Sequence, residues 1–81
     1  MFSYHAILYS YYTMTKKYNR IKSVLAEQEK TSIWLSEQIG KDKSTVSRWC
    51  TNDMQPSVES LFIIAKTLNV SPKDLLCDKW K

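Results

Sequence analysis

Apolar residues recur at the spacing of an α-helix from residue 19 onward. Ile21, Val24 and Leu25 are three and four positions apart and fall on one helical face. Gln28 continues that face. Asn19 precedes them and belongs to a residue type that caps helix N-termini. The pattern therefore predicts a first helix with Asn19 as its N-cap.

The next two helices are predicted to follow each other after a very short turn. Thr31 can cap the first of them, and Gly40, the only glycine, supplies the positive φ that favours a helix end. Asp42 then offers a carboxylate to the free amides of a new helix. The apolar positions are Leu35 and Ile39 in the first of these helices and Val46, Trp49 and Cys50 in the second. A pair of helices is thus expected at about residues 31–51.

Two further helices are predicted in the C-terminal third of the chain. Asn52 tolerates a left-handed backbone, so the third helix is expected to end near Thr51. Ser57 can cap a fourth helix that ends near Asn69, and the segment 71–74 combines a Ser cap, a Pro and a capping-box Asp. The apolar positions expected in the core are Leu61, Ile64, Ala65 and Leu68, followed by Leu75 and Leu76. The pattern as a whole predicts an all-α fold of five helices.

Composition narrows the range of functions. The chain has 81 residues, so one small core is expected, and one Gly with two Pro leaves few turns for β-hairpins. Cys50 and Cys77 stand far apart and His5 is the sole histidine, which predicts no zinc cluster, disulfide scaffold or other cofactor site. No apolar run reaches the roughly 18 residues of a membrane span, and no secretory leader is expected. We therefore expect a cytoplasmic protein that is not an enzyme, because a glycine-rich loop and a nucleophile–base pair are also missing.

Charge and composition change abruptly near residue 16. Residues 1–15 form a Tyr-rich extension, whereas residues 16–81 form the helical domain. The extension could be an added strand or a segment for a dimer or protein partner. It could instead be disordered, or result from an upstream start codon with Met14 as the natural start. The 12 Lys and Arg outnumber the 8 Asp and Glu, which suits a polyanionic partner. The basic cluster at Lys16, Lys17, Arg20 and Lys22 could be an arm along a duplex or a solvated helix start.

The helical segments resemble the Cro and repressor (Xre-type) helix-turn-helix family along about residues 19–77. Two helices that cross steeply need a glycine in the turn and a small residue where their backbones approach, and Gly40 and Ser36 stand at those positions. The other matching positions are Leu35, Val46, Ser47, Trp49, Pro56, Ser57, Ile64, Ala65, Leu68, Val70, Ser71, Leu75 and Leu76. The resemblance implies a small five-helix, lambda-repressor-like DNA-binding domain.

The resemblance also implies which residues contact DNA. The second helix of such a motif enters the major groove, and the residues expected to read bases there are Lys43, Ser44, Thr45, Ser47 and Arg48. Arg48 is the strongest candidate because a guanidinium can bond guanine O6 and N7 together. The residues expected at the DNA backbone are Ser32, Asp42, Thr51 and Asn52.

Three departures from the family pattern concern a phosphate contact, a buried pair and an aromatic residue. Ser32 stands where Gln is common, which predicts a shorter or water-mediated phosphate contact. Leu25 and Cys50 replace a buried Arg–Glu pair and are expected to pack against each other. Trp34 stands at a position that is normally polar, and packing is favoured over nucleic-acid contact.

The implied function is a sequence-specific transcriptional regulator, expected to act as a homodimeric repressor on double-stranded DNA with half-sites about 34 Å apart. The dimer surface is predicted either at residues 76–80 or in the Tyr-rich start. The alternative is a protein-interaction module of the same fold, such as the antitoxin of a toxin–antitoxin pair or a transcription adaptor. In that case the N-terminal segment is the functional part.

Overall fold

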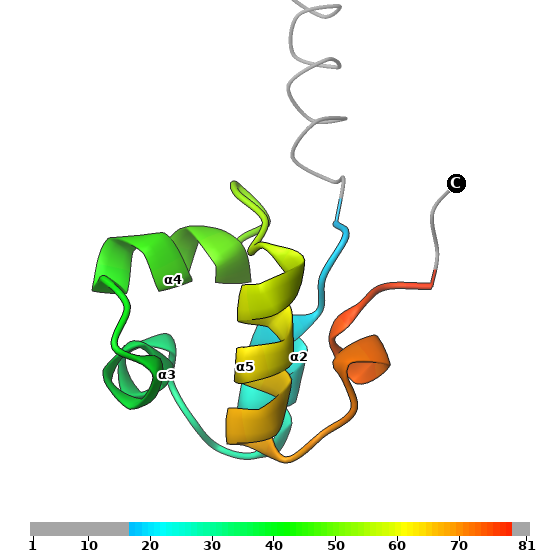
Figure 1. Ribbon diagram of the computed structural model, residues 1–81, viewed down its shortest axis with the longest axis horizontal. Helices are drawn as coiled ribbons and strands as arrows, with labels where there is room; N and C mark the ends of the chain where they lie inside the picture. Colours follow the sequence, from blue (N-terminus) through cyan, green and yellow to red (C-terminus); the bar gives the residue numbers. More distant parts are fainter. Residues whose placement is uncertain (1–16, 79–81) are drawn as a thin grey trace, which may run out of the picture.

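The computed structural model describes residues 17–78, and within them the chain forms four α-helices and one short 3-10 helix (Figure 1). The helices are α2 (Ile21–Glu27), α3 (Ser32–Ile39), α4 (Lys43–Cys50) and α5 (Val58–Leu68), and η1 (Pro72–Leu75) is the 3-10 helix. The described residues contain no strand, only an isolated bridge between Asn19 and Leu76. The all-helical prediction is confirmed. The fifth predicted helix is only four residues long and forms a single turn of 3-10 helix, the form that such short helical segments often take.

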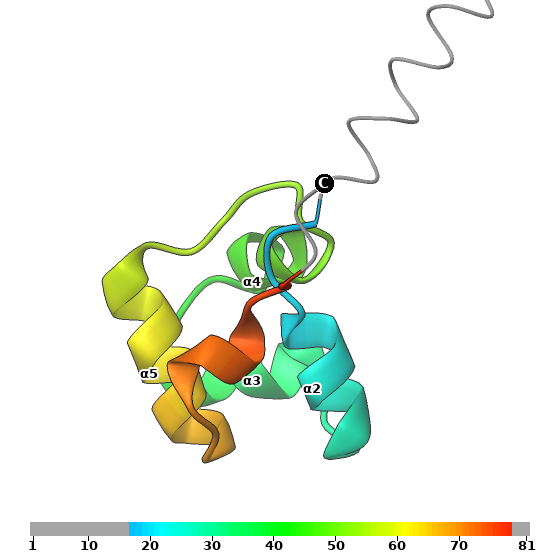
Figure 2. The ribbon, with the colours of Figure 1, turned by 90° about the vertical axis from the view of Figure 1, so that its right-hand side faces the viewer.

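The helices pack around α3 and α4, the predicted pair. Figure 1 shows α3 nearly end-on and α4 lengthwise, so the two cross steeply. Ser36 on α3 is 2% exposed, as expected for a small residue at this crossing. Helix α5 packs on α3, while α2 packs on α4, and η1 lies between α2 and α5 (Figure 2). The chain segment before α2 runs beside the segment after η1, where the Cys77 amide donates to the Tyr18 carbonyl at 2.9 Å.

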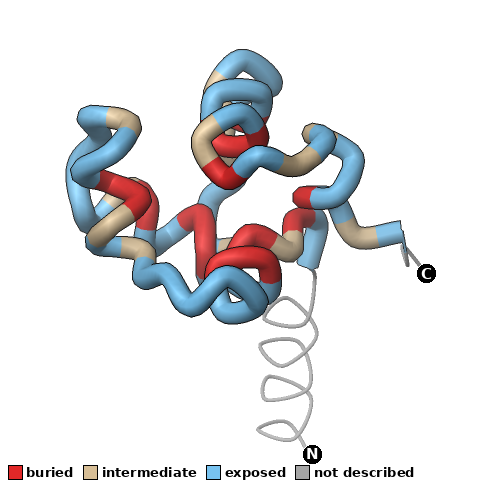
Figure 3. The backbone as a smooth tube through the Cα atoms, turned by 90° about the horizontal axis from the view of Figure 1, so that it is seen from below, coloured by how far each residue is buried: buried red, intermediate tan, exposed pale blue. Residues whose placement is uncertain are grey.

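One apolar cluster joins all five elements (Figure 3). Its members are Ile21, Val24, Leu25, Leu35, Val46, Trp49, Cys50, Leu61, Ile64, Ala65, Leu68 and Leu75, with Trp34, Ile39 and Val70 packed against it. The prediction that Leu76 closes the core is wrong, since its side chain is 46% exposed. Leu76 follows η1 in extended backbone, and neighbouring side chains of an extended segment point in opposite directions. The partly buried Trp34 agrees with the packing interpretation.

Short polar side chains begin three of the helices as predicted. The Thr31, Asp42 and Ser57 side chains accept the backbone amides of Trp34, Thr45 and Ser60, three residues further along. The predicted N-cap of the first helix is wrong, because Arg20 occupies that position without a side-chain cap bond. Asn19 acts one residue earlier, and its Oδ1 accepts the Ile21 amide at 3.0 Å. This local Asx turn leads the chain into α2.

Left-handed residues end α3 and α5 and follow α4. Gly40 has φ 71° and Asn52 has φ 65°, which confirms both predicted turns, and Asn69 has φ 58° at the end of α5. Glu29, after α2, is also left-handed, with φ 57°. This conformation was not predicted, since Glu has no special preference for it. The expectations for the Tyr-rich extension at residues 1–15 and for the end of the chain after Asp78 lie outside the described residues.

Candidate nucleic-acid interface

Helix α4 has one buried side and one exposed side. Val46, Trp49 and Cys50 face the core. The predicted base-reading residues lie together on the rest of the helix, where Lys43, Ser44, Ser47 and Arg48 are exposed and Thr45 is half-buried. The outer side of α4 therefore presents two cations and three hydroxyls, which are hydrogen-bonding groups suited to base edges and phosphates.

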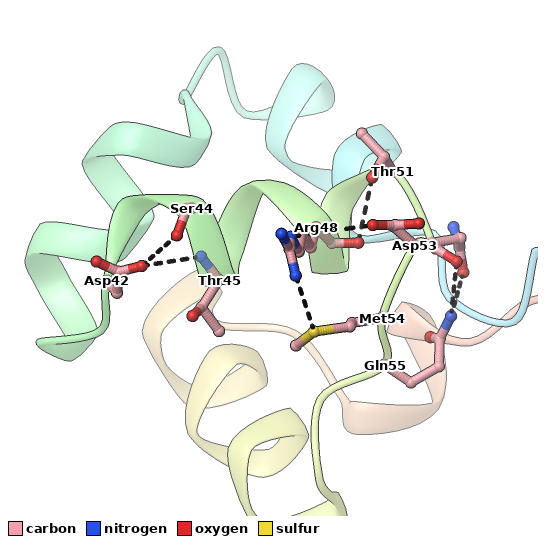
Figure 4. Close-up of polar contacts among 9 residues, drawn as sticks. Asp42, Ser44, Thr45, Arg48, Thr51, Asp53, Met54 and Gln55 are labelled. Atoms are coloured by element: carbon pink, nitrogen blue, oxygen red, sulfur yellow. Dashed lines mark hydrogen bonds and ion pairs between the residues drawn. The ribbon is translucent and has the colours of Figure 1, made fainter.

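The first turn of α4 is held by Asp42 (Figure 4). The Asp42 carboxylate accepts the Ser44 hydroxyl and, at 3.3 Å, the Thr45 amide. These two hydrogen bonds lower the pKa of Asp42, since they favour its charged form. Asp42 was predicted both as the cap of α4 and at the DNA backbone; the cap is confirmed, and the DNA contact stays a prediction. Because a carboxylate repels phosphate, the groups near Asp42 that suit a DNA backbone are the amides and hydroxyls of this turn and the Lys43 ammonium.

Arg48 lies on the last turn of α4 and is lightly held. Its Nε is 3.9 Å from an Asp53 carboxylate oxygen, and Nη1 is 4.0 Å from the Met54 sulfur (Figure 4). The Arg48 side chain remains 60% exposed. An exposed ion pair of this kind contributes about 0 to 1 kcal/mol, so it orients the guanidinium without fixing it. The contacts with Asp53 and Met54 were not predicted from the sequence.

The Asn52 side chain links the end of α4 to the segment that precedes α2. Its Oδ1 accepts the backbone amides of Tyr18 and Asn19 at 2.9 and 3.0 Å, and Nδ2 donates to the Asn19 carbonyl at 3.0 Å. Gln55 Nε2 also donates to Asn52 Oδ1, at 3.0 Å. The Asn52 side chain is thus bonded within the protein and has a structural role, and the phosphate contact expected for this residue stays a prediction.

Asn19 completes this connection from the other side. Its Nδ2 donates to the Trp49 carbonyl at 2.9 Å and to Gln55 Oε1 at 2.7 Å. The Asn19 residue is 3% exposed, so these bonds satisfy an amide that burial has removed from water. We call Asn19, Asn52 and Gln55 the polar junction. It fixes the C-terminal end of α4 and was not predicted as a unit.

Two of the predicted DNA-backbone residues line a hollow next to α4. Ser32 and Thr51 line it together with Lys22 on α2 and Lys30, which follows α2. Ser47 and Cys50 form its α4 side. Burial raises the pKa of the Cys50 thiol, although the nearby Lys22 charge acts against this, so the thiol stays neutral at pH 7. The hollow is cationic, and its lysines were not assigned to the site from the sequence.

The sequence of residues 21–75 matches the helix-turn-helix family. The chain belongs to the Xre/Cro-type helix-turn-helix family. A Bacteroides fragilis protein proposed to bind DNA has a similar crystal structure, with 52% sequence identity and a TM-score of 0.72. The similarity covers 74% of this chain and 97% of that protein. No curated protein matches the chain.

The helix-turn-helix assignment identifies α3 as the first helix of the motif and α4 as the second, which in this family is the reading helix. The turn between them is the segment around Gly40. Among residues 17–78, no helix is both long and apolar enough to span a membrane.

Proposed function

We propose that this helix-turn-helix protein is a sequence-specific regulator of transcription that reads the DNA major groove with α4. The observation that carries the proposal is the set of exposed polar side chains on α4, at Lys43, Ser44, Ser47 and Arg48, opposite a buried apolar side. Such a helix can enter the groove without disturbing the core. The protein acts by binding and needs no catalytic group.

Arg48 is proposed as the main base reader. Its guanidinium is exposed and held only by the weak contacts with Asp53 and Met54, so little is lost when it turns toward a guanine. Lys43, in the first turn of α4, suits either a base or a phosphate, because an ammonium is a point donor. Ser44, Thr45 and Ser47 supply shorter hydroxyl contacts beside them.

The backbone contacts are proposed around the cationic hollow. Ser32 is the first residue of α3 and lies beside free amides at a helix N-terminus, where a phosphate is favoured. Thr51 also lines the hollow, and Lys22 and Lys30 add two positive charges. Together these groups can hold one DNA strand while α4 lies in the groove.

The regulator is proposed to act as a homodimer on a partly palindromic operator, with half-sites about 34 Å apart. A single module of this size buries too little surface for tight specific binding. Repression follows when the bound dimer blocks polymerase. A DNA partner also supports the cytoplasmic setting expected from the two free cysteines.

Selection of bound duplexes from a random DNA pool tests this proposal. The selection is done at about 0.15 M salt, where purely electrostatic binding to any sequence is weak. We expect enrichment of a palindromic motif with two half-sites. If the folded protein enriches no sequence, the chain is not a sequence reader and the proposed function is wrong.

A further inference from the structure

The outer side of α5 carries apolar side chains that the core does not use. The helix buries Leu61, Ile64, Ala65 and Leu68. Phe62 and Ile63 lie between these positions and remain 58% and 47% exposed. In Figure 2, α5 lies at the left edge of the described part of the molecule and α2 lies on the opposite side. A single exposed apolar residue is ordinary, but two large neighbours on one helix leave a patch open to water.

The patch is part of a groove between α5 and the segment that follows it. The groove is lined by Glu59, Phe62, Ile63, Ala65, Lys66, Val70 and Pro72, and we call this set the α5 groove. No residue of α4 or of the cationic hollow belongs to it. A partner in the α5 groove therefore leaves the proposed reading helix free.

The charges of the α5 groove are arranged symmetrically about its apolar centre. Glu59 lies in the first turn of α5 and Lys66 lies in the last. The midpoint between residues 59 and 66 falls between Phe62 and Ile63. Neither Glu59 nor Lys66 forms an ion pair within residues 17–78. The groove thus has one unpaired acid, an apolar middle and one unpaired base in line.

Such a pattern is complementary to itself. When two identical helices pack antiparallel about a two-fold axis, residue i of one copy meets residue j of the other, and j meets i. With the axis over Phe62 and Ile63, Glu59 of each copy faces Lys66 of the other. Glu59 and Lys66 are seven positions apart, or about 10 Å along the helix, so both ion pairs form at the ends of one apolar contact.

We propose that the α5 groove is the surface through which two copies of this chain pair, with the two α5 helices antiparallel. The occupant is a second copy because the groove matches its own charge pattern and because a two-fold pair is what a palindromic operator requires. The inference rests on the proposed function. It replaces the two dimer surfaces expected from the sequence with one on α5.

Sedimentation equilibrium of the full 81-residue chain tests the pairing. We expect a concentration-dependent dimer. Phe62→Asp places a charge at the centre of the contact and should raise the dimer Kd at least tenfold, a loss of about 1.4 kcal/mol or more. Ile33→Asp is the matched control, because Ile33 is also an exposed apolar residue, at 51%, but lies on α3. It should leave the dimer Kd unchanged.

Charge reversal supplies a second test that leaves the apolar surface intact. Glu59→Lys and Lys66→Glu alone each create like-charge contacts and should weaken the dimer severalfold. The double variant restores opposite charges across the two-fold axis and should recover most of the parent affinity. A parent chain that stays monomeric, or a dimer unaffected by Phe62→Asp and both single reversals, would overturn the inference.

Binding to a duplex with one half-site separates this inference from the proposed function. Phe62→Asp should bind that duplex as the parent does and lose only the extra affinity for the full operator. If the parent binds no DNA sequence selectively yet dimerises through α5, the proposed function fails alone. If it reads DNA with a dimer that ignores the α5 changes, the α5 inference fails alone.

Discussion

Two turns flank α4, and both place one residue in the left-handed conformation. Before α4, Gly40 has φ 71°, and a Cβ built there would meet nothing within 4 Å. After α4, Asn52 has φ 65°, and its side chain bonds the backbone of Tyr18 and Asn19. The first turn only needs a permissive backbone, whereas the second also needs a particular side chain. Helix α4 thus begins after a turn that needs only a permissive backbone, with Asp42 as its cap, and ends beside the polar junction.

The difference matters because the two ends of α4 have different tasks. Lys43 and Ser44, which are proposed to contact DNA, lie in the first turn of α4, where the Asp42 cap accepts the Ser44 hydroxyl and the Thr45 amide. Arg48 lies next to the polar junction, so its Cα position is fixed while its side chain remains free. Under the proposed function, residues of α4 read bases, whereas Asn52, which follows the helix, stabilises its C-terminal end.

Replacing Asn52 should have the largest effect on stability. Asn52→Gly keeps the positive φ and removes the side-chain bonds, for a loss of about 2 kcal/mol in unfolding free energy. Asn52→Ala adds the strain of a left-handed alanine, about 1 kcal/mol more. Urea unfolding followed by circular dichroism measures both. Equal stability of both variants and the parent would mean that the polar junction does not hold α4.

Replacing Gly40 should cost less. Gly40→Ala meets no steric contact, so only the left-handed conformation is penalised, by roughly 1 to 2 kcal/mol. Gly40→Asn should lose less, because Asn tolerates this conformation. The same urea unfolding compares them. A loss as large as that of Asn52→Ala would show that the Gly40 turn is packed, contrary to the comparison.

The smallest effect is expected from acid at the start of α4. The pKa of Asp42 is lowered in the folded chain by the Ser44 hydroxyl and the Thr45 amide. The stabilisation it provides is present above the pKa of an unfolded Asp and is lost as the pH falls through the lower folded value. Asp42→Asn keeps a capping side chain that does not titrate. Thermal unfolding from about pH 7 to pH 2 should show the parent losing its advantage over Asp42→Asn only at the acid end, and an advantage that persists there would contradict the assignment.

Local signals carried most of the fold prediction. Thr31, Asp42 and Ser57 act within three residues of themselves, so the sequence reveals these caps directly. The left-handed backbone conformations of Gly40 and Asn52 were also predicted from the residue types at those positions. The backbone partners of the Asn52 side chain, at Tyr18 and Asn19, lie 34 and 33 residues away, and no local pattern specifies such a distance. Leu76 was misplaced because an apolar residue next to Leu75 looks identical in sequence whether it points inward or outward.

The site was predicted less completely than the fold. The exposed positions on α4 follow from helical periodicity, since the apolar residues of that helix define its buried side. Lys22 and Lys30 join Ser32 and Thr51 only when α2, α3 and α4 pack together. Phe62 and Ile63 were not singled out, although the predicted core positions Leu61, Ile64, Ala65 and Leu68 already leave them on the outer side of α5. Only the joining of Lys22 and Lys30 to the site required knowledge of the packing.

The reading role of Arg48 is the central claim, and binding of Arg48→Ala to the selected operator and its single-base variants tests it most directly. Lys73→Ala, which removes one exposed positive charge from η1, is the matched control. We expect Arg48→Ala to lose about 1 to 3 kcal/mol of discrimination at one base position of each half-site, while its unfolding free energy stays that of the parent. Lys73→Ala should keep the full preference. If Arg48→Ala retains the parent's preference at every position, Arg48 does not read a base and the account of α4 is wrong.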